Sequence, residues 1–334
     1  MSFSKWAGMK SRRAFLGAAL GATAVVSLQA EPAVAQDKLI PFAISTARSA
    51  AGVPEYYAKK YGIFEKNGLD VKMTEFAGAG NSIAAIQGGS LQAAYVIPGS
   101  AFTAIQNGLD LVFVAQQEVS KRTAPDTGSL QVLATSNIQT LADLKGKKIA
   151  IAVIGSPSAL AVQQLMRKAG VKPGEYDLLE MPFVAMFNAL KAKQVDAVTL
   201  INPFTTQGLT TGVGRVVAWP YVDSVPGQPI NAWVAKKAFV AQNPDLFDRF
   251  TRSLREAIDA LNADPAKARQ EVAAVTGLDP ELLKNMLAPS WDYNVRLADW
   301  DGTITLMKDE GVLKNPPKAE TYMTPAMLKF TDKK

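Results

Sequence analysis

The sequence predicts an α/β protein with two similar lobes, and three observations indicate this class. From about residue 38 onward, strand-like apolar runs alternate with helical patterns, which favours mostly parallel sheets flanked by helices. The segment ALKAKQVDAVTLINP (189–203) aligns without a gap with AIQGGSLQAAYVIPG (85–99). The two copies lie 104 residues apart (189 − 85), too far for a solenoid repeat, so a second lobe of similar build is expected.

The first lobe is expected to begin with the order strand, helix, strand, helix, strand. A strand is predicted at 38–47, and Gly62 ends the helix after it, since glycine commonly terminates helices. GIFEKNGLDVKMTEF predicts a turn and a second strand, SIAAIQGG predicts a helix, and LQAAYVI predicts a third strand.

The lobe borders follow from where this pattern repeats and where it stops. Residues 147–171 again show a strand, a small-residue turn and a helix that ends at Gly170, whereas residues 240–288 are strongly helical. The tail predicts one or two further helices, which we expect to pack on the first lobe. We therefore predict lobe 1 at 38–130 and 230–334, and lobe 2 at 131–229.

Residues 1–35 are predicted to be an export signal. Four basic residues precede a mildly apolar, uncharged run, and Ala33-Val34-Ala35 matches a cleavage site. Ser11-Arg12-Arg13-Ala14-Phe15-Leu16 matches the twin-arginine signal, although an ordinary secretory peptide with two adjacent arginines is the alternative. The sequence therefore predicts a periplasmic protein.

Composition excludes several classes of function. The chain has no Cys and no His, which removes disulfides, Cys or His metal sites and Ser-His-Asp or Cys-His catalysis. Of the 36 basic and 30 acidic residues, four and one lie in 1–35, so the remainder carries 32 − 29 = +3. This charge is too small and too dispersed to indicate nucleic-acid binding. No metal and no cofactor is predicted.

Small or polar residues stand at the ends of four predicted strands, each just before a helix. In open parallel sheets, ligands bind outside the carboxyl ends of the strands. A helix N-terminus offers free N–H donors, so these ends could hold an anion or a carbonyl. Each alone could equally be a helix cap, and their joint placement in two lobes favours a cleft.

The predicted ligand-binding residues belong to these strand ends and to two later segments. Arg48 could bind a carboxylate or sulfonate or simply lie on the surface; Asn202 could bind a ligand or start a turn; Trp233 could line a ligand site or fill the core. The full set is Thr46, Arg48, Ser49, Ala79, Gly80, Asn81, Gly99, Ser100, Gly155, Ser156, Ser158, Asn202, Phe204, Asn231 and Trp233.

Several segments resemble the periplasmic solute-binding proteins for aliphatic sulfonates, taurine, nitrate and thiamine-pyrimidine precursors. These segments are VPEYYAKKYGIFEKNGLDVKMTEF, AIQGGSLQAAYV, TLADLKGKKIAIA and the helix that begins NPDLF. The resemblance implies a two-lobed type II periplasmic binding protein with a ligand cleft between its lobes, and a partner permease of an ABC importer. It also implies that the strand-end loops bind the ligand.

The expected function is therefore ligand capture without catalysis, by a monomer. The sequence favours a small organic anion, a sulfonate or carboxylate, because several helix N-termini and Arg48 are expected near one cleft. The alternative ligand is a neutral heterocycle such as a thiamine-pyrimidine precursor or a flavin. Enzymes of pyrimidine synthesis and desulfination share this fold, but they rely on Cys or His, which this chain lacks.

Overall fold

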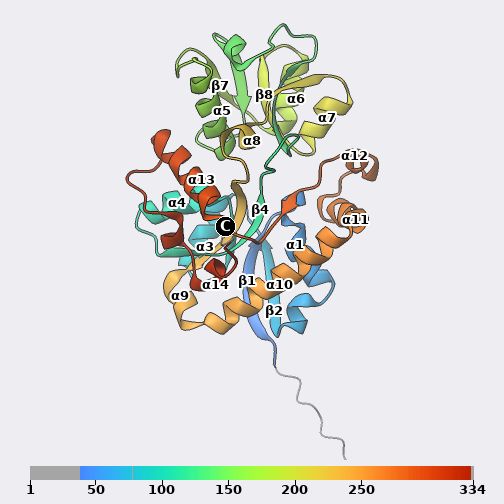
Figure 1. Ribbon diagram of the computed structural model, residues 1–334. Helices are drawn as coiled ribbons and strands as arrows, with labels where there is room; N and C mark the ends of the chain where they lie inside the picture. The colour runs from blue at the N-terminus through green and yellow to red at the C-terminus, as the bar shows by residue number, and fades with distance from the viewer. Residues whose placement is uncertain (1–37, 77, 332–334) are drawn as a thin grey trace, which may run out of the picture. The chain divides into compact units, whose positions relative to one another are not determined.

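The fold is described from a computed structural model, in which residues 38–76 and 78–331 are described (Figure 1). The predicted export signal at 1–35 lies outside these residues. Three sheets are present in the described part: a two-stranded sheet β1-β2, a four-stranded sheet β11-β4-β10-β3, and a five-stranded sheet β7-β6-β8-β5-β9.

The predicted order of strand, helix, strand, helix, strand is confirmed at the start of the described chain. The two strands form where apolar residues recur on one face: Phe42 and Ile44 of β1 and Val71 of β2 are buried. The elements are β1 (Ile40–Thr46), α1 (Val53–Lys60), α2 (Ile63–Lys66), β2 (Leu69–Glu75), α3 (Ala79–Gln87), β3 (Ala94–Val96) and α4 (Pro98–Gln106). β1 and β2 pair in parallel, as the short helical crossover requires.

The sheets are mixed rather than mostly parallel, which corrects the sequence-based expectation. β4 (Leu111–Val119) and β10 (Pro229–Lys236) pair antiparallel, and both β3 and β11 (Ser290–Trp291) join this pair antiparallel. β10 comes from the second half of the chain, so a pattern of local crossovers could not predict that it lies between β3 and β4.

The five-stranded sheet is formed by one continuous stretch of chain. Its elements are β5 (Gly128–Leu133), β6 (Lys148–Ile151), α5 (Pro157–Lys168), β7 (Asp177–Glu180), α6 (Phe183–Lys191), β8 (Ala197–Ile201), α7 (Phe204–Thr210) and β9 (Gly214–Ala218). β6 pairs in parallel with β7 and β8, whereas β5 pairs antiparallel with β8 and β9. The predicted repeat is confirmed in element order, since α6 and β8 match α3 and β3.

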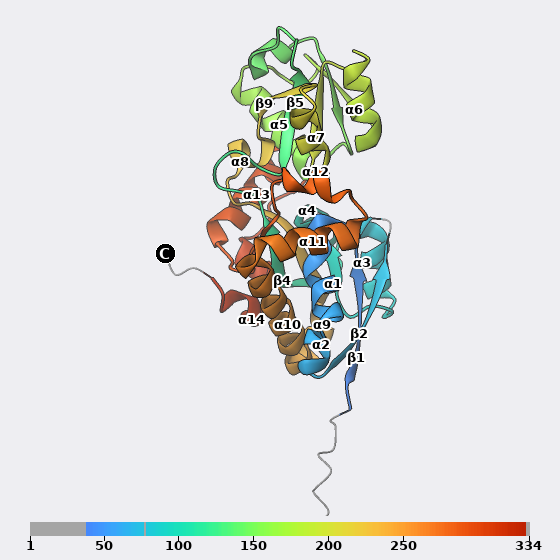
Figure 2. The ribbon, with the colours of Figure 1, turned by 90° about the vertical axis from the view of Figure 1, so that its right-hand side faces the viewer.

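The helices that follow β10 pack on the part built from β1 to β4, whereas α8 (Pro220–Ser224) contacts α5 and β5. The helices after β10 are α9 (Lys237–Gln242), α10 (Pro244–Ala263), α11 (Pro265–Thr276), α12 (Pro280–Lys284), α13 (Leu297–Asp309) and α14 (Pro325–Leu328). α1, α10 and α11 lie side by side (Figure 2). Buried Phe250, Leu254 and Ile258 recur along one face of α10 with helical spacing, which explains why this helix covers the core.

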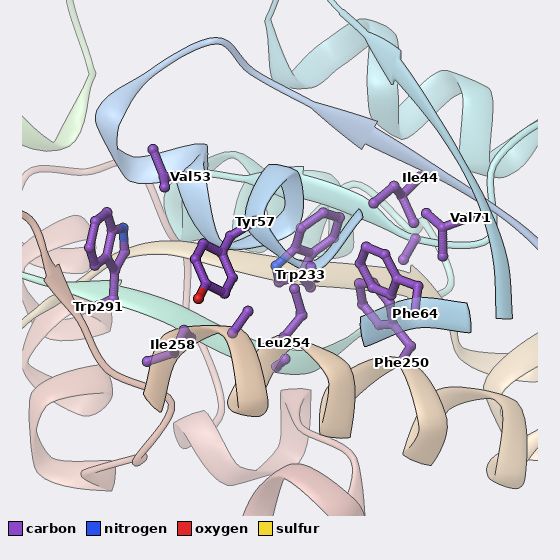
Figure 3. Packing of buried hydrophobic residues seen from close by; sticks show 14 of the residues in the cluster. Ile44, Val53, Tyr57, Phe64, Val71, Trp233, Phe250, Leu254, Ile258 and Trp291 are labelled. Carbon is purple, nitrogen blue, oxygen red and sulfur yellow. The ribbon is translucent and has the colours of Figure 1, made fainter. Parts of the chain in front are cut away.

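Four apolar clusters form the core. One joins β1, β2, α1 and α10 around Trp233, and Figure 3 shows this tryptophan packed beside Phe250 and Leu254. A second joins α3, α4 and α13 around Trp300. The other two lie entirely within residues 130–218, on the two faces of the five-stranded sheet. The five-stranded sheet therefore has a core of its own.

Candidate functional site

A cavity of about 240 Å³ lies where the ends of several strands meet, and we call it the head cavity. It joins residues from the four-stranded sheet, from the five-stranded sheet and from the loop before β11. Its lining residues are Ser49, Ala50, Ala51, Tyr95, Ile97, Glu118, Thr127, Pro157, Ile201, Asn202, Tyr221, Ile230, Asn231, Met286, Leu287 and Pro289. A volume of this size suits a small molecule rather than a peptide.

Polar groups on one wall of the head cavity are centred on Glu118. Its side chain is buried, and Asn231 Nδ2 donates a hydrogen bond of 2.6 Å to Glu118 Oε2. Burial raises the pKa of Glu118 to about 7, and the charge of Asp126 acts in the same direction, whereas the bond from Asn231 lowers it. Glu118 can therefore either donate or accept a hydrogen bond near neutral pH.

Two tyrosines add aromatic surface and hydroxyl groups to the same cavity. The Tyr95 hydroxyl is buried without a hydrogen-bond partner, which is rare in native proteins and points to a ligand or water as its partner. Burial raises the pKa of both Tyr95 and Tyr221, so both hydroxyls stay protonated. The cavity therefore offers hydrogen-bond donors next to a titratable carboxyl group.

A buried polar network holds the wall formed by Ser49 to Ala51. Gln117 Nε2 donates to the Ala51 carbonyl and to Glu55 Oε2, each at 2.9 Å, and Thr46 Oγ1 donates to Glu55 Oε1 at 3.1 Å. Burial raises the pKa of Glu55 to about 8. Because the network is buried and hydrogen-bonded, it fixes the backbone of this wall.

The opposite wall is tied to the loop before β11. Asn202 Nδ2 donates to the Leu287 carbonyl at 3.0 Å, and Asn202 Oδ1 accepts from the backbone and hydroxyl of Thr206. Both ends of this amide are therefore occupied within the protein. Asn202 therefore positions the wall of the cavity. Its amide was predicted to bind the ligand directly, but it bonds groups of the protein instead.

A second and larger cavity, of about 930 Å³, adjoins the first, and we call it the arm cavity. Ile97 and Pro157 line both cavities. Most other lining residues are apolar and come from α3, α4, α13 and the turn before α5. Gly99 lies next to two other lining side chains: a Cβ atom there would stand 3.4 Å from Met307 Cε and 3.9 Å from Pro157 Cγ, which are ordinary contact distances.

The structure divides most of the predicted ligand-binding residues between the two cavities. Ser49, Asn202 and Asn231 line the head cavity. Six others, all from helix starts, line the arm cavity: Ala79, Gly80, Gly99, Ser100, Gly155 and Ser156. These nine residues therefore line two adjoining cavities rather than one, and their binding of a ligand stays a prediction.

Arg48 and Trp233 lie elsewhere. The Arg48 side chain is 65% exposed and its Nε bonds Glu75 Oε1 at 2.6 Å, so it is committed to a surface ion pair and lines neither cavity. Trp233 is fully buried, and its indole N–H donates to Gln117 Oε1 at 2.7 Å. β-strand alternation turns Trp233 towards the apolar cluster that contains Phe250 and its neighbour Ala232 towards the cluster that contains Trp300. The core alternative for Trp233 is correct.

Four more predicted residues line neither cavity. Thr46 is buried in the Glu55 network, and Phe204 stacks on Phe183 with ring centroids 6.1 Å apart. Ser158 is within hydrogen-bond distance of Ser156, at 3.1 Å between the hydroxyl oxygens. Asn81 is exposed in the first turn of α3. These residues support the local structure around the strand ends.

Sequence reasoning missed Glu118, Tyr95 and Tyr221. The signal for Glu118 was present, because a charged residue in the apolar run LVFVAQQEV is unusual for a buried strand. Its partner Asn231 is 113 residues away, so only the fold brings the two together. Tyr95 had no signal beyond its place in a predicted strand.

No group of His, Cys, Asp or Glu side chains in 38–76 and 78–331 could hold a metal ion. Among the helices of the same residues, none is both long and apolar enough to cross a membrane.

Solved structures that are similar to this one share its fold. The periplasmic aliphatic sulphonate binding protein SsuA of Escherichia coli matches with a TM-score of 0.72 and 19% identity, over 85% of this chain and 97% of that one. These likenesses show that the chain has the two-lobed α/β fold of periplasmic binding proteins.

The chain belongs to the NMT1/THI5-like family, whose model matches residues 50–268. A protein of Brucella abortus named as a binding protein is 26% identical over 259 residues, covering 77% of this chain and 76% of its own length. The 4-amino-5-hydroxymethyl-2-methylpyrimidine phosphate synthase THI13 of Saccharomyces cerevisiae is 22% identical over 246 residues, covering 70% and 69%.

Proposed function

We propose that this protein is the solute-binding component of an ABC importer, exported to the periplasm, where it captures a neutral or weakly basic heterocycle in the head cavity. The protein acts as a monomer, without catalysis, and delivers its ligand to a membrane permease. The family, the fold and the names of the relatives support the transport role. The lack of Cys and His supports the absence of catalysis.

The observation that carries the ligand class is the charge of the head cavity. Glu118 is the one acidic residue among those that line the head cavity, and no lining residue is Lys or Arg. A sulfonate or carboxylate placed there would be repelled by the ionised form of Glu118 and would meet no cation. The cation predicted for it, Arg48, pairs with Glu75 instead.

A nitrogen heterocycle matches the same groups. Asn231 binds Glu118 Oε2, so the other oxygen, Oε1, is open to a ring nitrogen or an exocyclic amine. Tyr95 and Tyr221 can pack on a flat ring, and the Tyr95 hydroxyl can gain the partner that it lacks. The pyrimidine in the name of the yeast relative is a ligand of this kind, which supports the choice.

A thermal-shift screen over aminopyrimidines, other neutral heterocycles, sulfonates, carboxylates and nitrate tests the ligand class. A ligand that binds only the folded state raises the midpoint of unfolding, so aminopyrimidines are expected to give the largest shift. Stabilisation by anions alone would contradict the proposal. Catalysis is tested on the best ligand: product that accumulates beyond one equivalent per protein would refute a pure binding role.

The role of Glu118 is tested by calorimetry on the best ligand. Glu118→Gln is expected to weaken binding about tenfold or more, since hydrogen bonds to charged groups contribute about 1.5–3 kcal/mol. Glu271→Gln is the matched control, because Glu271 is also a buried carboxyl, lines neither cavity and lies outside the Glu55 network. Equal affinity of the wild type and Glu118→Gln would remove Glu118 from the binding site.

The export route and the lobe borders are part of the same proposal. Replacement of Arg12 and Arg13 by Lys is expected to leave the protein in the cytoplasm if the twin-arginine route is used. An unchanged periplasmic yield would indicate the general secretory route. We place the lobes at 38–130 with 230–334 and at 131–229, in keeping with the position of the five-stranded sheet.

A further inference from the structure

The head and arm cavities share two lining residues. Ile97, at the end of β3, and Pro157, at the start of α5, belong to both. A molecule that fills the head cavity therefore borders directly on the arm cavity. The two cavities together are as large as the site of a drug-sized molecule, which measures about 300–1,000 Å³. A single heterocycle is smaller than such a molecule and would fill only a small part of this space.

The chemistry of the two cavities differs sharply. The head cavity holds Glu118, Asn231 and two tyrosines. The arm cavity has no charged residue in its lining, and aliphatic side chains cover most of it. These side chains include Ile83, Ile97, Val153, Ile154, Leu109, Leu160, Leu306, Met307 and Val312.

Gln228 marks the arm cavity as a site for a ligand rather than a packing defect. Its side chain is fully buried, and its Nε2 donates to the Tyr221 carbonyl at 3.3 Å. A carbonyl oxygen can only accept, so the amide nitrogen of Gln228 must face it. The amide oxygen, Oε1, therefore points away from this contact and has no hydrogen-bond partner. A buried acceptor without a partner costs stability unless a ligand or water supplies a donor.

Large apolar side chains are also exposed along this cavity. Val153 and Ile154 are 56% and 57% exposed, and Ile97 is 41% exposed. Contiguous exposed apolar residues beside a polar pocket are typical of a surface that a ligand covers. Val184, which is 64% exposed on α6, lies outside both cavities and serves as a reference for the experiment.

We infer that the ligand is an elongated molecule of two parts: a flat polar head in the head cavity, and an aliphatic arm that passes between Ile97 and Pro157 into the arm cavity. A hydrogen-bond donor near the junction bonds Gln228 Oε1. This inference rests on the proposed function, because it takes the head to be the heterocycle that Glu118 and Asn231 bind. It adds the substrate class: heterocycles that carry an apolar substituent.

The test compares two probes by calorimetry: 4-amino-5-methylpyrimidine and 4-amino-5-pentylpyrimidine. They share one head and differ by four methylenes. Each methylene that is fully buried is expected to raise affinity about fourfold, so the pentyl probe should bind at least about 30-fold more tightly. Equal affinity of the two probes would overturn the inference and leave the proposed function standing.

Two valine variants locate the arm. Val153→Asp places a charge on the wall of the arm cavity and is expected to abolish the advantage of the pentyl probe while leaving the methyl probe unchanged. Val184→Asp makes the same change at an exposed valine away from both cavities and should leave both affinities unchanged. If Val153→Asp retains the full advantage, the arm does not lie in this cavity and the inference is wrong.

A different result identifies a failure of the proposed function itself. If neither probe binds the wild-type protein while a sulfonate or carboxylate does, the heterocyclic head is wrong and the inference falls with it. A folded state of each variant is established first by its thermal unfolding transition. Both valines are exposed, so both variants should fold.

Discussion

Replacing Glu118 by Gln is expected to make the stability of the protein less dependent on pH. Glu118 is buried, and its pKa is raised from an ordinary value of 4.5 to about 7, mainly because burial disfavours the charged form. Between these values the folded state binds a proton that the unfolded state has released. The free energy of unfolding therefore falls as pH rises from about 4.5 to 7 and beyond.

The magnitude follows from the size of the shift. One pKa unit corresponds to about 1.4 kcal/mol, so a shift from 4.5 to about 7 represents about 3 kcal/mol in total. Part of this is already lost at pH 5, where the unfolded glutamate is mostly ionised. Between pH 5 and pH 8.5 the wild type should lose about 2 to 3 kcal/mol through Glu118, and Glu118→Gln should not.

Urea unfolding of both proteins at pH 5 and pH 8.5, without ligand, measures this difference. Glu55 also has a raised pKa, of about 8, but it is present in both proteins and cancels in the comparison. Glu320→Gln, at an exposed glutamate, is the control and should match the wild type. An identical pH dependence in the wild type and Glu118→Gln would refute the argument that Glu118 is buried with a raised pKa.

Three further substitutions test the placement of side chains around the site. Arg48→Ala should leave ligand affinity unchanged in calorimetry, because Arg48 pairs with Glu75 at the surface; a tenfold loss would restore Arg48 to the site. Trp233→Phe should cost about 1–3 kcal/mol in urea unfolding, since Gln117 Oε1 loses its donor, and should not change ligand affinity; a loss of affinity would show that the indole contacts the ligand. Gln117→Met should lower the free energy of unfolding by at least about 2 kcal/mol, because Glu55, Trp233 and the Ala51 carbonyl all lose their partner. A change below about 0.5 kcal/mol, which is typical of surface substitutions, would mean that the network is not formed.

The sequence predicted the elements that depend on local patterns. Apolar alternation and glycine stops were sufficient for β1, α1, β2, α3 and β3, and the internal similarity was sufficient for α6 and β8. Helix starts with small residues correctly indicated which turns border a cavity. These features depend on residues that are neighbours along the chain.

Features that depend on distant pairs could not be predicted in this way. The position of β10 between β3 and β4 results from antiparallel pairing across more than a hundred residues. Arg48 looked like a ligand-binding cation because its partner, Glu75, is 27 residues away on the next strand. Strand alternation does not distinguish a core position from a ligand site for Trp233. Its packing against Phe250, with ring centroids 5.0 Å apart, shows that it belongs to the core.

The arrangement of the cores along the chain has a consequence for how the protein folds during synthesis. Two apolar clusters lie wholly within residues 130–218, so that stretch can complete its core as soon as it has emerged from the ribosome. The cluster around Phe42 and Phe64 must wait for Phe250 and Leu254, nearly 200 residues later. The amino-terminal strands therefore spend most of translation exposed. A chain that ends at residue 240 should give a protease-resistant fragment near 128–218 and lose 38–119, whereas equal resistance of both would contradict this order.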